Sequence, residues 1–144
     1  DFPRNLLKRF VFGLPWEVNI MKAIKTDKAP KALGPYSQAI LTGSNLYISG
    51  QIAINPETGM MVTDTIEAET EQIMNNIEAI LEEARLNFTF VVKTTIFVTD
   101  IKYFDAVNGV YAKFFKENPT ARSFVQVAGL PKGAHVEIET IAVR

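Results

Sequence analysis

The clearest alternation of hydrophobic and polar positions lies near the C-terminus, in two strand-like runs at residues 122–128 and 135–142. Between them, the Gly-Leu-Pro-Lys-Gly segment at 129–133 favours a turn. If the two strands pair antiparallel, Arg122 lies on one face of the first strand and Glu137 on one face of the second. This pairing would bring a guanidinium and a carboxylate together, either as a functional pair or as a surface salt bridge of small energetic effect.

Three further runs rich in β-branched and apolar residues predict strands at 36–41, 46–54 and 91–98. The polar Thr-Gly-Ser-Asn segment at 42–45 predicts a hairpin between the first two. Gly50 interrupts the second strand. It indicates either a β-bulge or a place where a ligand or another chain lies against the backbone.

Helical spacing of apolar residues predicts two amphipathic helices. Asp64 and Glu67 resemble a capping box at the start of the first helix, which we expect to run for about five turns. Asp100 can cap the second helix, which we expect to end at Asn118-Pro119. The apolar positions are Ile66, Ile73, Ile77, Ile80, Leu81 and Ala84 in the first helix, and Phe104, Val107, Tyr111, Phe114 and Phe115 in the second.

The first helix also carries many acidic residues, which we interpret as a solvated face rather than as general bases. They are Glu67, Glu69, Glu71, Glu78, Glu82 and Glu83.

The order of elements is strand, strand, helix, strand, helix, strand, strand, with an extra strand at either 60–63 or 21–25. This order predicts an α+β fold, a single sheet with two helices packed on one face. The other face still carries apolar residues, and leaving it open would expose a large apolar patch. We therefore expect the chain to oligomerise.

Composition narrows the class of protein. The 144 residues suit one globular domain, and the net charge of −1 gives no general attraction to a nucleic-acid backbone. Cysteine is absent, which excludes disulfides and thiolate chemistry, and the single histidine, His135, makes a zinc site improbable. No run reaches the roughly 20 apolar residues of a membrane span.

Residues 1–20 are apolar and mildly basic, and Met21 stands where an ordinary start would fall. We interpret them as an N-terminal extension, either added during cloning or translated from an upstream start. The lack of serine and the presence of Asp1 and Glu17 argue against a transit peptide. We expect the Leu, Phe and Trp side chains of this extension to lie on an apolar surface, such as a neighbouring subunit.

Several motifs, spread in order over residues 21–144, resemble those of the reactive intermediate deaminase family, also called RidA or YjgF-like. They are Ala-Pro at 29–30, Gly-Pro-Tyr-Ser-Gln-Ala at 34–39, Ser-Gly-Gln-Ile at 49–52, Val-Asn at 107–108, Pro-Thr-Ala-Arg-Ser at 119–123, Leu-Pro at 130–131 and Val-Glu-Ile-Glu at 136–139.

The resemblance implies a chorismate-mutase-like fold and a homotrimer whose sheets line a central barrel, with ligand sites in the clefts between subunits. It also implies hydrolysis of reactive 2-imino or 2-enamino acids to 2-keto acids and ammonia, with no metal or organic cofactor. A cytoplasmic location is expected, and a mitochondrial one only if residues 1–20 are the remnant of a transit peptide.

The resemblance also assigns roles to individual residues. Arg122 would bind the substrate carboxylate through its planar fork, and Glu137 would hold the attacking water or pass its proton. The pocket would be lined by Tyr36, Ser49, Gly50 and Asn108, together with Phe124.

Phe124 departs from the family pattern, in which many members carry a cysteine two residues after the arginine. The phenylalanine cannot donate or accept as a thiol does. It either removes a contact that activity needs or reshapes the pocket for a larger substrate.

Two other classes of function stay open at this point. One is a binding protein for small acids without turnover. The other is a single-strand endoribonuclease or translation inhibitor, which the sequence pI near 5.9 makes less favourable.

Overall fold

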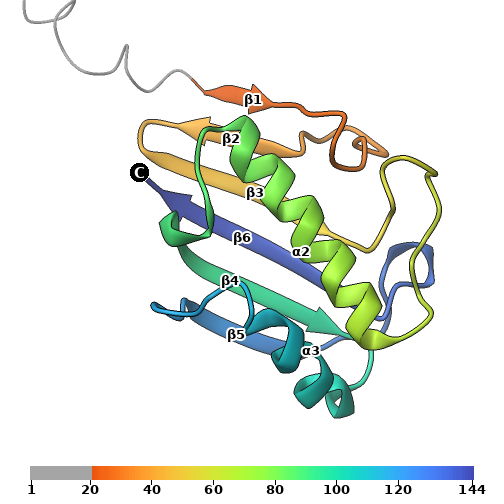
Figure 1. Ribbon diagram of the computed structural model, residues 1–144. Helices are drawn as coiled ribbons and strands as arrows, with labels where there is room; N and C mark the ends of the chain where they lie inside the picture. The colour runs from red at the N-terminus through yellow and green to blue at the C-terminus, as the bar shows by residue number, and fades with distance from the viewer. Residues whose placement is uncertain (1–20) are drawn as a thin grey trace, which may run out of the picture.

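A computed structural model describes residues 21–144, so the expectation for the side chains of residues 1–20 lies outside the described residues. The described chain forms one six-stranded sheet in the order β1-β2-β3-β6-β4-β5 and two α-helices (Figure 1). The strands are β1 (Lys22–Ile24), β2 (Ala39–Thr42), β3 (Asn45–Gln51), β4 (Val91–Val98), β5 (Ala121–Gln126) and β6 (Val136–Val143), and the helices are α2 (Ile66–Glu83) and α3 (Phe104–Tyr111).

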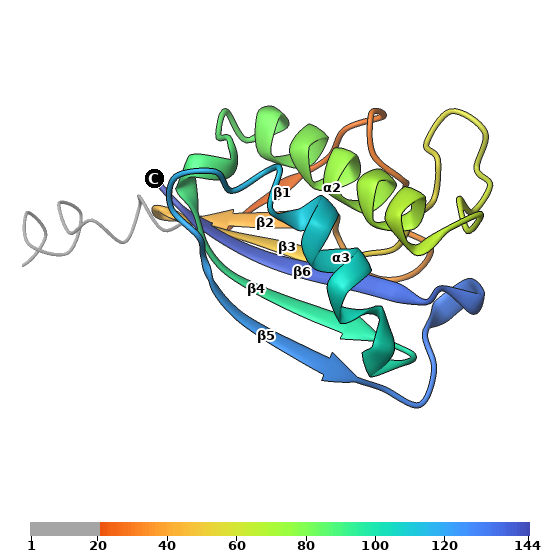
Figure 2. The ribbon, with the colours of Figure 1, turned by 60° about the horizontal axis from the view of Figure 1, so that its bottom comes forward.

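Both helices lie over the same face of the sheet, and the other face carries no helix of the described residues (Figures 1 and 2). The core lies between the two layers, where apolar side chains of α2 pack on those of the central strands. It includes Ile73, Ile77, Ile80 and Leu81 from α2 and Leu46, Ile48, Ile96 and Ile138 from the sheet. The predicted α+β fold, with two helices on one face of a single sheet, is confirmed. The chorismate-mutase-like homotrimeric barrel stays a prediction.

The pairing of the two C-terminal strands differs from the antiparallel hairpin considered from the sequence. Strand β5 pairs with β4 in parallel, and β6 lies on the other side of β4, antiparallel to it. The turn at 129–133 therefore carries the chain past β4 instead of joining two neighbouring strands. Alternation had predicted which residues of each strand share a face, but it carries no information on which strand lies next to which.

The hairpin between β2 and β3 forms as predicted, with Thr42 opposite Asn45 and Gly43 in the left-handed region at a φ of 56°. Strand β3 ends earlier than expected, at Gln51. The register against β6 shifts between Ile48 and Gln51, so the interruption at Gly50 is a bulge.

The extra strand is the one predicted at 21–25, since β1 pairs with β2. The alternative at 60–63 contributes only an isolated bridge between Met61 and Ile54.

Helix α2 has the predicted length of five turns, but its cap differs from the predicted one. Thr65, rather than Asp64, is the N-cap, and its hydroxyl accepts a hydrogen bond from the Ala68 amide at 3.0 Å. The third helical residue is thus Ala68 instead of Glu67, so a reciprocal capping box does not form.

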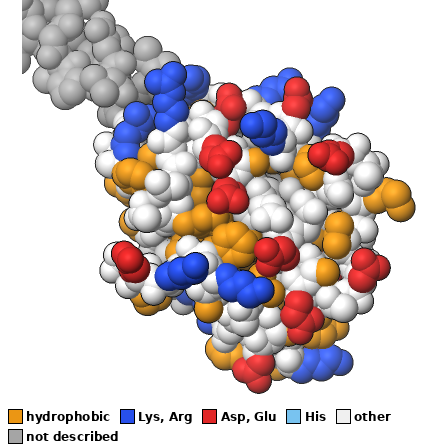
Figure 3. Space-filling view, in the orientation of Figure 1, with side chains coloured by type: hydrophobic (Ala, Val, Ile, Leu, Met, Phe, Trp, Pro, Cys, Tyr) orange, Lys and Arg blue, Asp and Glu red, His pale blue; other side chains and the backbone are white. Residues whose placement is uncertain are grey.

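The prediction that the glutamates of α2 form a solvated face is wrong for Glu69, which is fully buried. The other five are exposed or half-buried. Figure 3 shows acidic side chains interspersed with Lys and Arg on the face that carries the helices.

The carboxylate of Glu69 lies against the start of β6. It accepts hydrogen bonds from the backbone N–H groups of His135 (2.7 Å) and Val136 (3.2 Å), and its second oxygen lies 3.0 Å from His135 Nδ1. A buried carboxylate needs such partners, and here they come from a segment 66 residues away.

The second helix is shorter than predicted. Asp100 caps a 3₁₀ turn, Ile101–Tyr103, and α3 then runs only to Tyr111. Beyond it the backbone makes tighter i→i+3 hydrogen bonds, which direct Phe114 toward Phe88 instead of continuing the helix to residue 118. Within residues 21–144, no helix is both long and apolar enough to cross a membrane.

Candidate functional site

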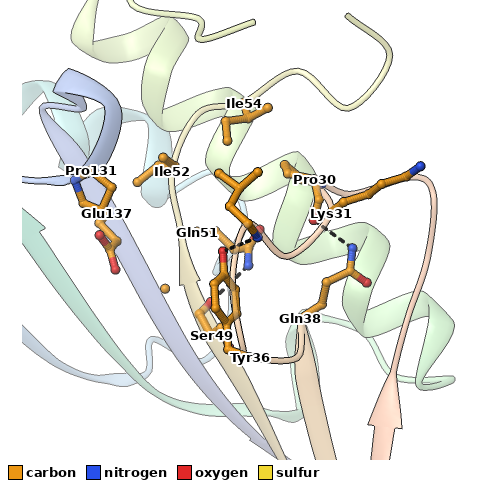
Figure 4. Close-up of a pocket in the computed structure, with 12 residues that line it drawn as sticks. Pro30, Lys31, Tyr36, Gln38, Ser49, Gln51, Ile52, Ile54, Pro131 and Glu137 are labelled. Atoms are coloured by element: carbon orange, nitrogen blue, oxygen red, sulfur yellow. Dashed lines mark hydrogen bonds between the residues drawn. The ribbon is translucent and has the colours of Figure 1, made fainter. Parts of the chain in front are cut away.

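A cavity of about 450 Å³ lies at the ends of β3 and β6, beside the segment that precedes β2 (Figure 4). It contains four of the predicted site residues, Tyr36, Ser49, Gly50 and Glu137. The remaining lining residues are Pro30, Lys31, Leu33, Gln38, Gln51, Ile52, Ile54 and Pro131. The cavity thus combines mostly apolar walls with one carboxylate.

Glu137 lies directly against Gly50. A Cβ atom built on Gly50 would lie 1.9 Å from Glu137 Oε1, so any other residue at position 50 would force the carboxylate to move. Glycine thus lets the Glu137 carboxylate occupy this position, next to the bulge in β3.

The surroundings of the Glu137 carboxyl group affect its protonation. Burial, and to a smaller extent the neighbouring Glu139 carboxylate, raises the pKa of Glu137 above its ordinary value. The Glu137 carboxyl group makes no hydrogen bond to residues 21–144, so neither charge state is fixed by a protein donor. A carboxyl group of this kind suits a general acid or base.

Two further residues of the cavity are held by local hydrogen bonds. The Ser49 hydroxyl donates to the Ser37 carbonyl at 2.6 Å, and the Tyr36 hydroxyl accepts from the Leu33 amide at 3.0 Å. Tyr36 is still 52% exposed, so its ring forms an open wall of the cavity instead of packing in the core.

The other three predicted site residues form a second group, on β5 and α3. Arg122 donates a hydrogen bond from Nη1 to Asn108 Oδ1 at 2.6 Å. Phe124 packs edge-on against Phe104 of α3, with ring centroids 4.9 Å apart. Among the described residues, Asn108 is the one hydrogen-bond partner of a guanidinium that has five donors, so the fork can still bind an anion.

Arg122 and Glu137 lie on opposite faces of the sheet. Arg122 is in register with Thr94 of β4, which is buried beneath the helices. Glu137 is in register with Phe97 of β4, three positions further along and thus on the other face. A single chain therefore does not bring the guanidinium and the carboxylate together, and the sequence-based expectation of one shared place is wrong for the isolated chain.

Several cavity residues were not identified from the sequence as functional. Gln38 is the most instructive, since its buried amide accepts from the Thr26 amide at 2.8 Å and donates to the Pro30 carbonyl at 2.8 Å. Asn76 of α2 similarly donates to the Ile54 carbonyl at 2.9 Å. These two amides fix two irregular walls of the cavity. A polar residue within an apolar run is the sequence signal that could have pointed to such buried amides. The sequence alone does not show which groups they bind.

The chain thus carries two groups suited to complementary chemistry, a guanidinium with free donors and a carboxyl group with a raised pKa. Within residues 21–144, no cluster of three or more His, Asp or Glu side chains could hold a metal ion.

The sequence is similar to those of several known proteins. Residues 26–144 match the family model described as endoribonuclease L-PSP. The human protein 2-iminobutanoate/2-iminopropanoate deaminase is 46% identical over 125 residues, which cover 87% of this chain and 91% of the relative. The putative regulator AldR of Lactococcus lactis is 52% identical over 122 residues, covering 85% and 97%.

Solved structures show the same fold. RidA from an Antarctic Psychrobacter bacterium superposes with a TM-score of 0.83 at 44% identity, covering 85% of this chain and 99% of that one. E. coli TdcF with bound serine gives a TM-score of 0.82 at 40% identity, covering 85% and 98%. The chain therefore belongs to the endoribonuclease L-PSP family, the RidA or YjgF-like family that its motifs resemble.

Proposed function

We propose that this protein hydrolyses reactive 2-imino and 2-enamino acids to 2-keto acids and ammonia. The observation that carries the proposal is the half-buried Glu137 carboxyl group, which lies against Gly50 with a raised pKa in a cavity large enough for a small acid. The names of the human, rat, goat and bovine relatives, each 46–47% identical, support the same activity.

The proposed reaction adds water across a C=N bond. Glu137 accepts a proton from water while the oxygen attacks the imine carbon, and it passes this proton to the imine nitrogen, to which the C=N electron pair moves. The carboxylate then takes the hydroxyl proton of the carbinolamine and returns it to the nitrogen as the C–N bond breaks, which releases ammonia and the 2-keto acid and leaves Glu137 ionised. A 2-enamino acid enters the same steps after it tautomerises to the imine. Arg122 binds the substrate carboxylate through two parallel hydrogen bonds, which orients the planar acid for attack. No cofactor takes part in these steps.

A complete site in this proposal requires two subunits, because Arg122 and Glu137 lie on opposite faces of one chain. The helix-free face supports such an assembly. It exposes Tyr47 (46%) and Val125 (42%), and the half-buried Phe97 and Ile141 lie on the same face. Covering these side chains with neighbouring subunits gives the homotrimer expected for the family.

In the proposed site, Tyr36, Ser49 and Gly50 of one subunit surround the reacting carbon of the substrate. Asn108 and Phe124 of the neighbouring subunit lie beside the carboxylate group of the substrate. Phe124 packs on Phe104 and not on Glu137, so the residue at this position shapes the wall near the arginine. The proposed chemistry does not need a thiol there.

The deciding experiment measures keto-acid release from 2-iminobutanoate generated freshly by an amino-acid oxidase, with and without the protein. We expect the wild-type protein to raise the rate of keto-acid release. Protein with Arg122 replaced by lysine should give a rate close to that without protein. Binding of a 2-keto acid without faster release would favour a small-acid binding protein. Cleavage of single-stranded RNA that is insensitive to changes at Arg122 and Glu137 would favour a ribonuclease. The cytoplasmic location stays a prediction.

A further inference from the structure

The guanidinium of Arg122 lies among three aromatic rings. Its central carbon is 5.1 Å from the ring centroid of Tyr111, 5.6 Å from that of Phe104 and 5.7 Å from that of Phe124. Each distance falls within the range in which a cation is attracted to the face of an aromatic ring. Neither Tyr111 nor Phe104 belongs to the proposed contacts with substrate.

The Tyr111 hydroxyl is hydrogen-bonded to the side chains of two threonines near the arginine. Its oxygen lies 2.7 Å from Thr94 Oγ1 and 2.6 Å from Thr120 Oγ1. Thr94 is the register partner of Arg122 on β4, and Thr120 directly precedes β5. The hydroxyl therefore fixes the tyrosine ring relative to β4 and to the start of β5, the strand that carries Arg122.

Helix α3 supplies all three groups that approach the arginine from above the sheet. Phe104, Asn108 and Tyr111 are spaced by four and then three residues, so they lie along one side of the helix. Phe104 is 42% exposed and is held by its edge-on contact with Phe124. In this position its ring also lies 5.6 Å from the guanidinium carbon.

We propose that Tyr111 and Phe104 are positioning residues that hold the Arg122 guanidinium in one orientation, with its free donors directed at the substrate carboxylate. This inference rests on the proposed role of Arg122 as the carboxylate-binding group. A long arginine side chain loses several rotamers when it binds an anion, and holding it in advance lowers that entropic cost. The two residues should therefore affect substrate binding more than the chemical step.

The test compares Phe104→Leu and Tyr111→Phe with Phe88→Leu as a matched control. The first removes one ring beside the arginine, and the second keeps the ring but removes the hydroxyl that fixes it. Phe88 belongs to a neighbouring aromatic group, packed on Phe114 and Phe115, and does not contact Arg122.

We expect Phe104→Leu and Tyr111→Phe each to raise KM for the 2-imino acid, and Kd for the product 2-oxobutanoate, by about threefold to fivefold. The value of kcat should stay within about twofold, because the general base is untouched. In ¹⁵N NMR spectra, the Nε–Hε signal of Arg122, assigned by its loss in Arg122→Lys, should shift and broaden in both variants. Phe88→Leu should lower the melting temperature without changing KM, Kd or this signal.

Wild-type KM, Kd and NMR signal in both variants, or changes no larger than those of Phe88→Leu, would overturn the inference. The NMR measurement keeps it separate from the proposed function. If the wild-type protein hydrolyses no imine, the proposed function fails, but an altered Arg122 signal in the two variants still supports the positioning role.

Discussion

The two charged groups of the proposed site, Arg122 and Glu137, differ in how many contacts hold their side chains. Arg122 is surrounded by contacts, with an amide partner at 2.6 Å and three rings within 5.7 Å. The Glu137 carboxyl group has no hydrogen-bond partner within the described residues, and the backbone of Gly50 lies against it. The cation is thus held in place, whereas the acid is left free to gain and lose a proton.

This difference fits the two tasks that the reaction requires. A group that orients a carboxylate must keep one geometry and one charge, and arginine remains charged at every physiological pH. A group that activates water must change charge during each turnover, so a hydrogen bond that stabilised its ionised form would lower its basicity. The predictions below test whether the two regions differ in this way.

The largest effect is expected from Arg122→Lys. Lysine keeps the charge but loses the planar fork, so two charge-assisted hydrogen bonds to the substrate cannot form together. We expect kcat/KM for 2-iminobutanoate to fall by about 10³-fold. Light scattering should give the same mass for the variant and the wild type, and a wild-type rate would show that Arg122 has only a structural role.

Glu137→Gln should lower kcat by about 10²-fold, the low end of general-base effects, while binding of 2-oxobutanoate persists. The same change should not destabilise the fold. Because the pKa of Glu137 is raised above 4.5, its charging opposes folding as the pH rises through that higher value. The neutral glutamine avoids this penalty.

Urea unfolding of Glu137→Gln and the wild type at pH 4 and pH 7 checks the stability. The variant should be at least as stable as the wild type at pH 7, and the two should converge at pH 4. A variant that is less stable than the wild type at pH 7 would mean that the Glu137 carboxylate makes stabilising contacts. The contrast between a held Arg122 and an unpartnered Glu137 would then be wrong.

Mixing the two inactive variants tests whether the regions meet across subunits. After Arg122→Lys and Glu137→Gln chains are denatured together and refolded in equal amounts, about a quarter of the sites should combine an intact arginine with an intact glutamate. We expect the mixture to recover about a quarter of wild-type activity by this counting. Activity no higher than the mean of the separately refolded variants would place both groups of each site in one chain.

The smallest effect is expected from Glu139→Gln. Removing this neighbouring negative charge lowers the pKa of Glu137, because a like charge opposes its ionisation. The acid limb of the pH profile of kcat/KM should therefore move to lower pH, while the maximum rate changes little. Glu82→Gln, an exposed site near the end of α2, is the matched control and should leave the profile in place.

Much of the fold follows from local patterns in the sequence. The β-branched run at 91–98 gave β4 with the correct limits, and the helical spacing after Thr65 gave the length of α2. Alternation correctly places Glu137 opposite to Val136 and Ile138, both of which are buried in the core. Each of these features depends on residues that are close together in the chain.

Features that depend on distant partners could not be predicted in the same way. Strand order is one, because β5 and β6 could pair directly or flank β4 with the same alternation. Glu69 is another: its position, three residues after Ile66 and four before Ile73, lies on the apolar stripe of α2, but the spacing does not say what a buried carboxylate there would contact. Its burial depends on the amides of His135 and Val136, to which no local signal connects it.

For the proposed site, the motifs named seven residues, whose roles stay a prediction. These motifs carry no information on the faces of the sheet. The separation of Arg122 from Glu137 became evident only from the register of β4 with its two neighbours.

A single newly synthesised chain, with Arg122 and Glu137 on opposite faces, presents no complete site. On the proposed assembly, hydrolysis begins only when folded chains meet, and the specific activity of very dilute protein falls as the assembly dissociates. The local concentration of the protein would then determine when the chains become active in hydrolysis.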